Sequence, residues 1–225
     1  MRHGLGLVLI MLALLTPLTI MAGGLNRSPA SGTDESAAVP LSPVSPKPLM
    51  LADAALADAR EILSADNSCS RFFGGTAEVM DVLDGLSGRI RLQRLPDRLV
   101  GIRMTGGEAT FISHLTGYEY RLFREVIINT NGPFYSSGNA FSPMPRCGSF
   151  WPNTREARVL MLLHELGHMI KGANGKWLLP DDGGNDRKSL SNTRIIEAKC
   201  LPQIKALESP EGLAGKLEDR ARDQE

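Results

Sequence analysis

Residues 155–170 read REARVLMLLHELGHMI, and the run of apolar residues at 159–163 lies inside this stretch. Asn153 or Thr154 precedes it, and either side chain is suited to cap the first turn of a helix. The apolar run supplies the side chains that such a helix would bury. The stretch therefore predicts a long, largely buried helix that ends near Lys171.

The pattern H-E-x-x-H occupies residues 164–168 of this predicted helix. His164 and His168 are four residues apart, so a helix places both imidazoles on one face, where they can bind one ion. Neutral imidazoles suit zinc better than calcium or magnesium. Glu165 can take a proton from a zinc-bound water while the water attacks a carbonyl group. The alternative is a buried helix face without metal, but burying two histidines and a glutamate without a partner is costly.

The remaining residues predict a small sheet and several more helices. Helical spacing predicts three of them, at residues 51–63, from residue 76 onward, and at residues 191–200. Alternating apolar residues predict four short strands, at residues 90–92, 100–104, 109–111 and 124–129. Helices, a small sheet and then the H-E-x-x-H helix predict an α+β domain.

The ends of the chain differ in composition from its middle. Residues 1–24 begin with a short positive segment followed by an uncharged apolar run, which predicts a secretory signal peptide or, if it is not cleaved, a membrane anchor. Residues 25–48 are rich in Ser, Pro and Ala and predict a disordered linker. The domain is expected at 49–207, followed by a charged tail at 208–225. This organisation predicts a secreted or periplasmic protein.

The charge balance bears on the partners of the protein. Lys and Arg total 25, Asp and Glu total 25, and the formal net charge is zero. A nucleic-acid binder is expected to carry a basic excess, so this class is set aside. The partner expected from the H-E-x-x-H pattern is a peptide or protein substrate, with a membrane involved only through an uncleaved N-terminal segment.

Three cysteines in an exported chain predict one disulfide and one odd thiol. A bond between Cys69 and Cys200 would tie the two ends of the domain, but the sequence leaves the pairing open. Cys147 precedes the H-E-x-x-H helix. Its thiolate could occupy the open position on the zinc and hold the enzyme latent, or it could form a disulfide or remain a buried thiol.

The H-E-x-x-H helix, with a strand before it and a turn after it, resembles the zincin metallopeptidases. The chain also resembles, more loosely, a group of small exported bacterial H-E-x-x-H proteins. The features that carry the second resemblance are Cys69, Asp182-Gly183, Asn192-Thr193 and Cys200. These resemblances imply a zincin-like domain with peptidase activity. They also imply that strand 126–129 is an edge strand that pairs with an extended substrate.

The third zinc ligand differs between zincin subclasses. The metzincin pattern requires His or Asp six residues after the second histidine, where this chain has Asn174. A gluzincin arrangement would use Glu197 on the next helix. An aspzincin arrangement would use Asp181 or Asp182 from the following loop, although such Pro-Asp-Gly segments also form plain surface turns. Asp182 is the favoured third ligand, and the other two remain alternatives.

Four further residues are weaker candidates. His114 is expected to be an ordinary strand histidine. The hydroxyls of Tyr118, Tyr120 and Tyr135 could stabilise an oxyanion, although amphipathic packing is the common use of tyrosine. The sequence thus predicts an exported zinc-dependent peptidase. A non-catalytic zinc-containing binding module and a cell-wall zinc amidase are the alternatives.

Overall fold

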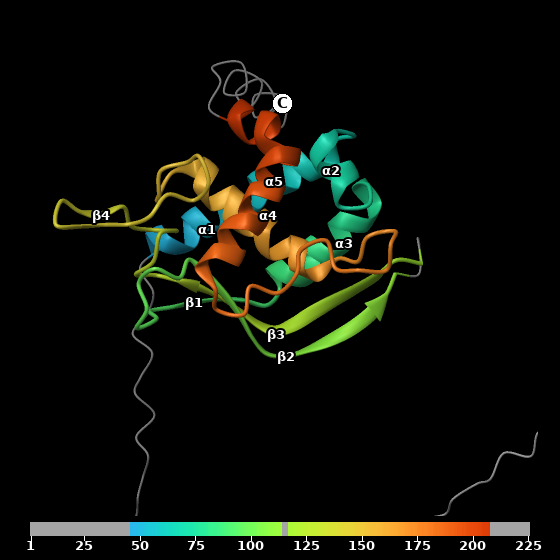
Figure 1. Ribbon diagram of the computed structural model, residues 1–225, viewed down its shortest axis with the longest axis horizontal. Helices are drawn as coiled ribbons and strands as arrows, with labels where there is room; N and C mark the ends of the chain where they lie inside the picture. The colour runs from blue at the N-terminus through green and yellow to red at the C-terminus, as the bar shows by residue number, and fades with distance from the viewer. Residues whose placement is uncertain (1–45, 114–116, 208–225) are drawn as a thin grey trace, which may run out of the picture. The chain divides into compact units, whose positions relative to one another are not determined.

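The computed structural model describes residues 46–113 and 117–207. The predicted signal peptide, most of the predicted linker, the charged tail and His114 lie outside these residues. The described chain is an α+β fold, as the sequence predicted, and it has five helices and a small mixed sheet. The helices gather on one side of the sheet (Figure 1). In chain order the elements are α1 (Pro46–Ser64), α2 (Ser68–Phe72), α3 (Thr76–Ser87), β1 (Ile90–Gln93), β2 (Ile102–Ile112), β3 (Glu119–Asn129), β4 (Gly138–Asn139), β5 (Ser142–Pro143), α4 (Arg155–Met169) and α5 (Asp186–Ala206).

The H-E-x-x-H helix, α4, lies at the centre of the core. Thr154 is its N-cap, because the Thr154 hydroxyl accepts a hydrogen bond from the backbone N–H of Ala157. The apolar run that precedes the first histidine is almost wholly inaccessible to solvent. Helices α1, α3 and α5 and the strands β2 and β3 all contact α4. His164 and His168 therefore project from a buried helix.

The helices differ from the sequence predictions mainly at their ends. The helix expected at residues 51–63 begins at Pro46, and α3 begins at Thr76 as predicted. The short helix α2 was not predicted. It begins after Asn67, whose side chain accepts hydrogen bonds from the N–H groups of Cys69 and Ser70.

The three-stranded sheet has the order β1-β3-β2. Strand β1 pairs with β3 in parallel, with Ile90 opposite Val126, and β2 pairs with β3 antiparallel. The two strands expected at 100–104 and 109–111 form the single strand β2, with a register shift between Thr105 and Glu108. Two glycines with positive φ lie at this shift and permit the irregular backbone.

The prediction that strand 126–129 is an edge strand is wrong. These residues belong to β3, which is hydrogen-bonded to a neighbouring strand on each side. Because Ile90–Gln93 pairs with Val126–Asn129 on one edge and β2 pairs with β3 on the other, neither edge is open for hydrogen bonds to a substrate. Strands β1 and β2 are the edge strands, and the first residues of β2 line a cleft that the H-E-x-x-H residues also line.

A disulfide between Cys69 and Cys200 ties α2 to α5. It is one of the pairings that the sequence left open, and Cys147 remains a free thiol. Structural disulfides persist in oxidising compartments, so this bond indicates an environment outside the cytoplasm. Within residues 46–113 and 117–207, no helix has the length and apolar character needed to cross a membrane.

Candidate metal centre

His164 and His168 face each other one turn apart on α4. Both residues are buried, and their Nε2 atoms lie 3.1 Å apart. Asp182 reaches this pair from the loop between α4 and α5. Its Oδ2 lies 3.2 Å from Nε2 of His164, and its Oδ1 lies 3.6 Å from Nε2 of His168. The structure thus brings the three residues together into a group that could hold a metal ion.

The spacing of these atoms suits a single ion. A tetrahedral ion that holds nitrogen and oxygen ligands at about 2.0–2.2 Å separates any two of them by about 3.3–3.6 Å. The two Nε2 atoms are 3.1 Å apart, and Asp182 lies 3.2 and 3.6 Å from them through its two different carboxylate oxygens. With one ligand atom taken from each residue, all three lie within 4.8 Å of one another. Two imidazoles and one carboxylate are also an established ligand set of first-row metals. Three protein ligands would leave a fourth position for water or substrate.

Gly167, inside the H-E-x-x-H pattern, lets the Asp182 loop approach α4. A Cβ atom at Gly167 would lie 2.7 Å from a methyl carbon of Leu179, closer than packed carbon atoms come. The Leu179 side chain is fully buried there. The backbone N–H of Leu179 donates a hydrogen bond to the Gly167 carbonyl at 3.0 Å. This contact fixes the loop three residues before Asp182.

Two residues of α5 contact the ligand candidates His164 and Asp182. Asn192 donates from Nδ2 to Oδ1 of Asp182 at 2.6 Å and to the Pro180 carbonyl at 2.8 Å. Thr193 Oγ1 lies 3.0 Å from Nδ1 of His164. Such outer partners orient metal ligands. Sequence reasoning gave neither residue a role, and the only signal was their place in the Asn-Thr feature of the looser resemblance.

The group is electrostatically coupled. Burial acts to raise the pKa of Asp182, but hydrogen bonds and charge from His164 and hydrogen bonds from Ser189 and Asn192 outweigh it and hold the pKa at about 2. Burial and the neighbouring His164 lower the pKa of His168 to about 4. Burial also opposes the charged form of His164, but the hydrogen bond to Asp182 and two nearby carboxylates raise its pKa overall. The proton between His164 and Asp182 is the one that a metal ion would displace.

Glu165 lies beside the group and takes no part in it. Burial raises the pKa of Glu165 to about 7, His164 opposes this shift, and Asp182 adds to it. The carboxyl group therefore titrates near neutral pH, which suits a group that accepts and returns a proton. Glu165 and the three ligand candidates all line the same cleft, of about 800 Å³.

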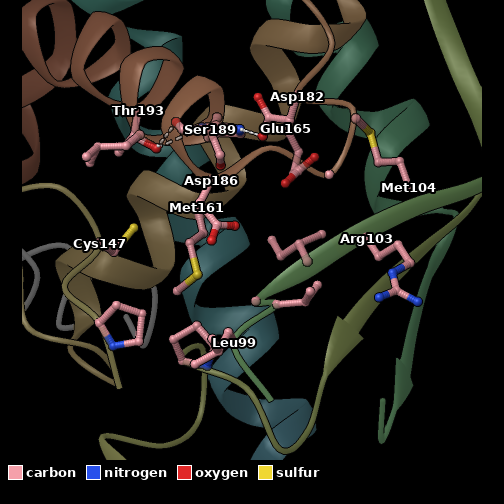
Figure 2. A pocket seen from close by; sticks show the side chains of 18 of the residues that line it. Leu99, Arg103, Met104, Cys147, Met161, Glu165, Asp182, Asp186, Ser189 and Thr193 are labelled. Atoms are coloured by element: carbon pink, nitrogen blue, oxygen red, sulfur yellow. Dashed lines mark hydrogen bonds and ion pairs between the residues drawn. The ribbon is translucent and has the colours of Figure 1, made fainter. Parts of the chain in front are cut away.

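The cleft runs between strand β2 and the first turns of α5. Figure 2 shows Glu165 and Asp182 together on one wall, with Leu99 and Met161 away from them. The lining also includes apolar residues, among them Leu99, Val100, Pro133, Pro145 and Met161.

The alternative third ligands lie outside the group. Asp181 pairs with Arg121. Glu197 accepts a hydrogen bond from the N–H of Ser149 at 2.7 Å. Of the three described tyrosines none lines the cleft: Tyr120 stacks on a phenylalanine, Tyr135 donates to a backbone carbonyl near the start of α1, and Tyr118 also lies elsewhere.

Cys147 lines the cleft on the side opposite Asp182 in Figure 2. Its Sγ is not a member of the His-His-Asp group. Burial raises the pKa of the Cys147 thiol to about 12, and the nearby Glu197 and Glu165 add to this shift. The thiol is therefore protonated at neutral pH as long as no metal ion is bound to it.

The fold and the site define an α+β protein with a candidate His-His-Asp metal centre on a buried helix. Comparison with protein-family models, curated proteins and solved structures found no match. What the structure adds to the H-E-x-x-H motif is therefore a group of three residues that could hold a metal ion.

Proposed function

We propose that this protein is a zinc-dependent peptidase that acts outside the cytoplasm. The observation that carries the proposal is the position of Glu165. It lies next to two imidazoles and a carboxylate that could hold one metal ion, and all four side chains line one cleft. A purely structural metal site has no use for such a carboxylate, which argues against a non-catalytic binding module.

The chemistry that zinc supplies when bound is Lewis acidity, which lowers the pKa of a water ligand to about 7 and polarises a carbonyl group. His164, His168 and Asp182 would hold the ion. Glu165 would take the proton of the attacking water and pass it to the leaving amine, and a pKa of about 7 suits both transfers.

Strand β2 supports the proposal that the substrate is an extended peptide. One side of β2 is hydrogen-bonded to β3, and the strand has no partner on its other side among the described residues. Its first residues, Ile102, Arg103 and Met104, line the cleft. A peptide that added to this edge would pass the metal centre, and the apolar residues of the cleft would accept an apolar side chain. Strand β2 thus replaces strand 126–129 in this role.

The test is hydrolysis by the full chain. We expect the zinc-loaded protein to cleave fluorescein-labelled casein, 1,10-phenanthroline to abolish cleavage, and added Zn²⁺ to restore it. If zinc-loaded protein cleaves neither casein nor a mixed peptide library, the peptidase proposal fails. Cleavage of peptidoglycan fragments under those conditions would reassign the centre to a cell-wall amidase.

A further inference from the structure

Arg121, on strand β3, is a buried cation next to the metal centre. The residue is 3% exposed, and a buried guanidinium is costly unless its donors are satisfied. Its Nε donates to the backbone carbonyl of His168 at 2.7 Å, and its Nη1 donates to Glu108 at 2.7 Å. Its Nη2 donates to Asp181. Helix α4, strand β2 and the loop before α5 therefore all contact this one side chain.

Two of these contacts lead directly to metal-ligand candidates. The carbonyl of His168 belongs to a ligand residue, and Asp181 immediately precedes Asp182. The guanidinium also lies 4.3 Å from the ring centroid of Trp177, in the same loop. Arg121 thus contacts both ends of the segment that joins the second ligand to the third.

Asp181 would be poorly fixed without this contact. Its side chain is 68% exposed, whereas the side chain of Arg121 is 4% exposed. The rigid partner is thus the arginine on the sheet, and the carboxylate on the loop is held against it. Glu108 binds another nitrogen of the same guanidinium but belongs to strand β2 and not to the ligand loop.

We propose that Arg121 is a positioning residue of the metal centre. Through Asp181 and the His168 carbonyl it fixes Asp182 relative to His168 and so increases the affinity for the ion. This inference rests on the proposed metal site. The competing role is stabilisation of the fold alone, in which case both carboxylate partners of Arg121 would matter only for unfolding.

The two carboxylates provide a matched experiment on the full chain. Asp181→Ala and Glu108→Ala each remove one negative charge and one partner of Arg121. Asp181→Asn removes the charge but keeps an amide oxygen that can accept from the guanidinium. The affinity for Zn²⁺ is measured by competition with a chromophoric chelator, and the visible spectrum of Co²⁺-loaded protein reports the coordination of the ion.

We expect Asp181→Ala to weaken Zn²⁺ binding by about 10- to 100-fold, as the loss of an outer partner does, and to change the Co²⁺ spectrum. Glu108→Ala should weaken Zn²⁺ binding by less than about threefold, because Glu108 and Arg121 form a partly exposed ion pair. It should leave the Co²⁺ spectrum unchanged. Asp181→Asn should retain most of the affinity. If the alanine variant does not fold, Asp181→Ser is judged by the same criteria.

Three results would overturn the inference alone: unchanged affinity in Asp181→Ala, equal losses in Asp181→Ala and Asp181→Asn, or equal losses in Asp181→Ala and Glu108→Ala. The second would indicate an effect of charge, and the third a structural role. Wild-type protein that bound neither metal would overturn the proposed function and this inference together.

Discussion

The hydroxyl of Thr193 lies 3.0 Å from Nδ1 of His164 and points its own proton at the backbone carbonyl of Ser189, 2.9 Å away. Since the hydroxyl proton is already donated, Thr193 must accept a hydrogen bond from Nδ1–H of His164. Nε2, the nitrogen that faces His168 and Asp182, is then free to bind a metal ion once its own proton is displaced.

Thr193→Val should therefore weaken metal binding by about 10- to 100-fold, because valine keeps the shape of threonine but cannot accept the Nδ1–H bond. Thr193→Ser is the matched control and should bind nearly as tightly as wild type. Chelator competition measures both. Equal affinity in the valine variant and in wild type would show that His164 is oriented by other contacts.

Alanine variants distinguish Asp182 from Glu197 as the third metal ligand. Asp182→Ala should lose most of its zinc during dialysis, whereas Glu197→Ala should retain it, because Glu197 lies outside the His-His-Asp group and bonds to the Ser149 N–H. Zinc remaining after dialysis is measured by atomic absorption. The opposite order of losses would assign the centre to the gluzincin arrangement.

Glu165→Gln should keep the metal and lose hydrolysis. The amide preserves the size of the side chain but cannot take a proton, so the rate of casein cleavage should fall by at least about 100-fold. Zinc content measured on the same sample is the control. A variant that cleaves at the wild-type rate would remove Glu165 from the mechanism.

Reduction of the disulfide should destabilise the fold. The bond joins residues 131 positions apart, and loop entropy predicts a loss of about 5 kcal/mol in the free energy of unfolding. Urea unfolding of the Cys147→Ser variant, with and without dithiothreitol, measures this loss free of the odd thiol. Identical unfolding midpoints would contradict it.

The sequence predicted the parts of the site that depend on local spacing. Thr154, the apolar run and the H-E-x-x-H pattern together predicted the central helix. The place of Asp182 in the next loop favoured it as a third ligand, but Asp181 and Glu197 remained alternatives. The start of α5 was predicted wrongly. The helix begins at Asp186 with Asn185 as its N-cap, directly after the Gly183-Gly184 turn, and the sequence analysis did not recognise this N-cap. The predicted helix began at Ser191, so the turn that faces the cleft was not recognised.

The features that sequence could not supply depend on long-range pairing. Whether β3 is an edge strand depends on Ile90 lying opposite Val126, and no local pattern encodes this pairing. The role of Arg121 arises from partners 13, 47 and 60 positions away. The sequence alone shows only that Arg121 is a charged residue, because its partners are brought to it by the fold.

The most direct test of the central claim is the zinc content of the full chain after reconstitution and removal of free metal. Elemental analysis should give about one zinc per chain for wild type and almost none for His164→Ala or His168→Ala, since both imidazoles belong to one centre. Wild-type protein without zinc, or a His168→Ala variant that holds as much zinc as wild type, would contradict the account.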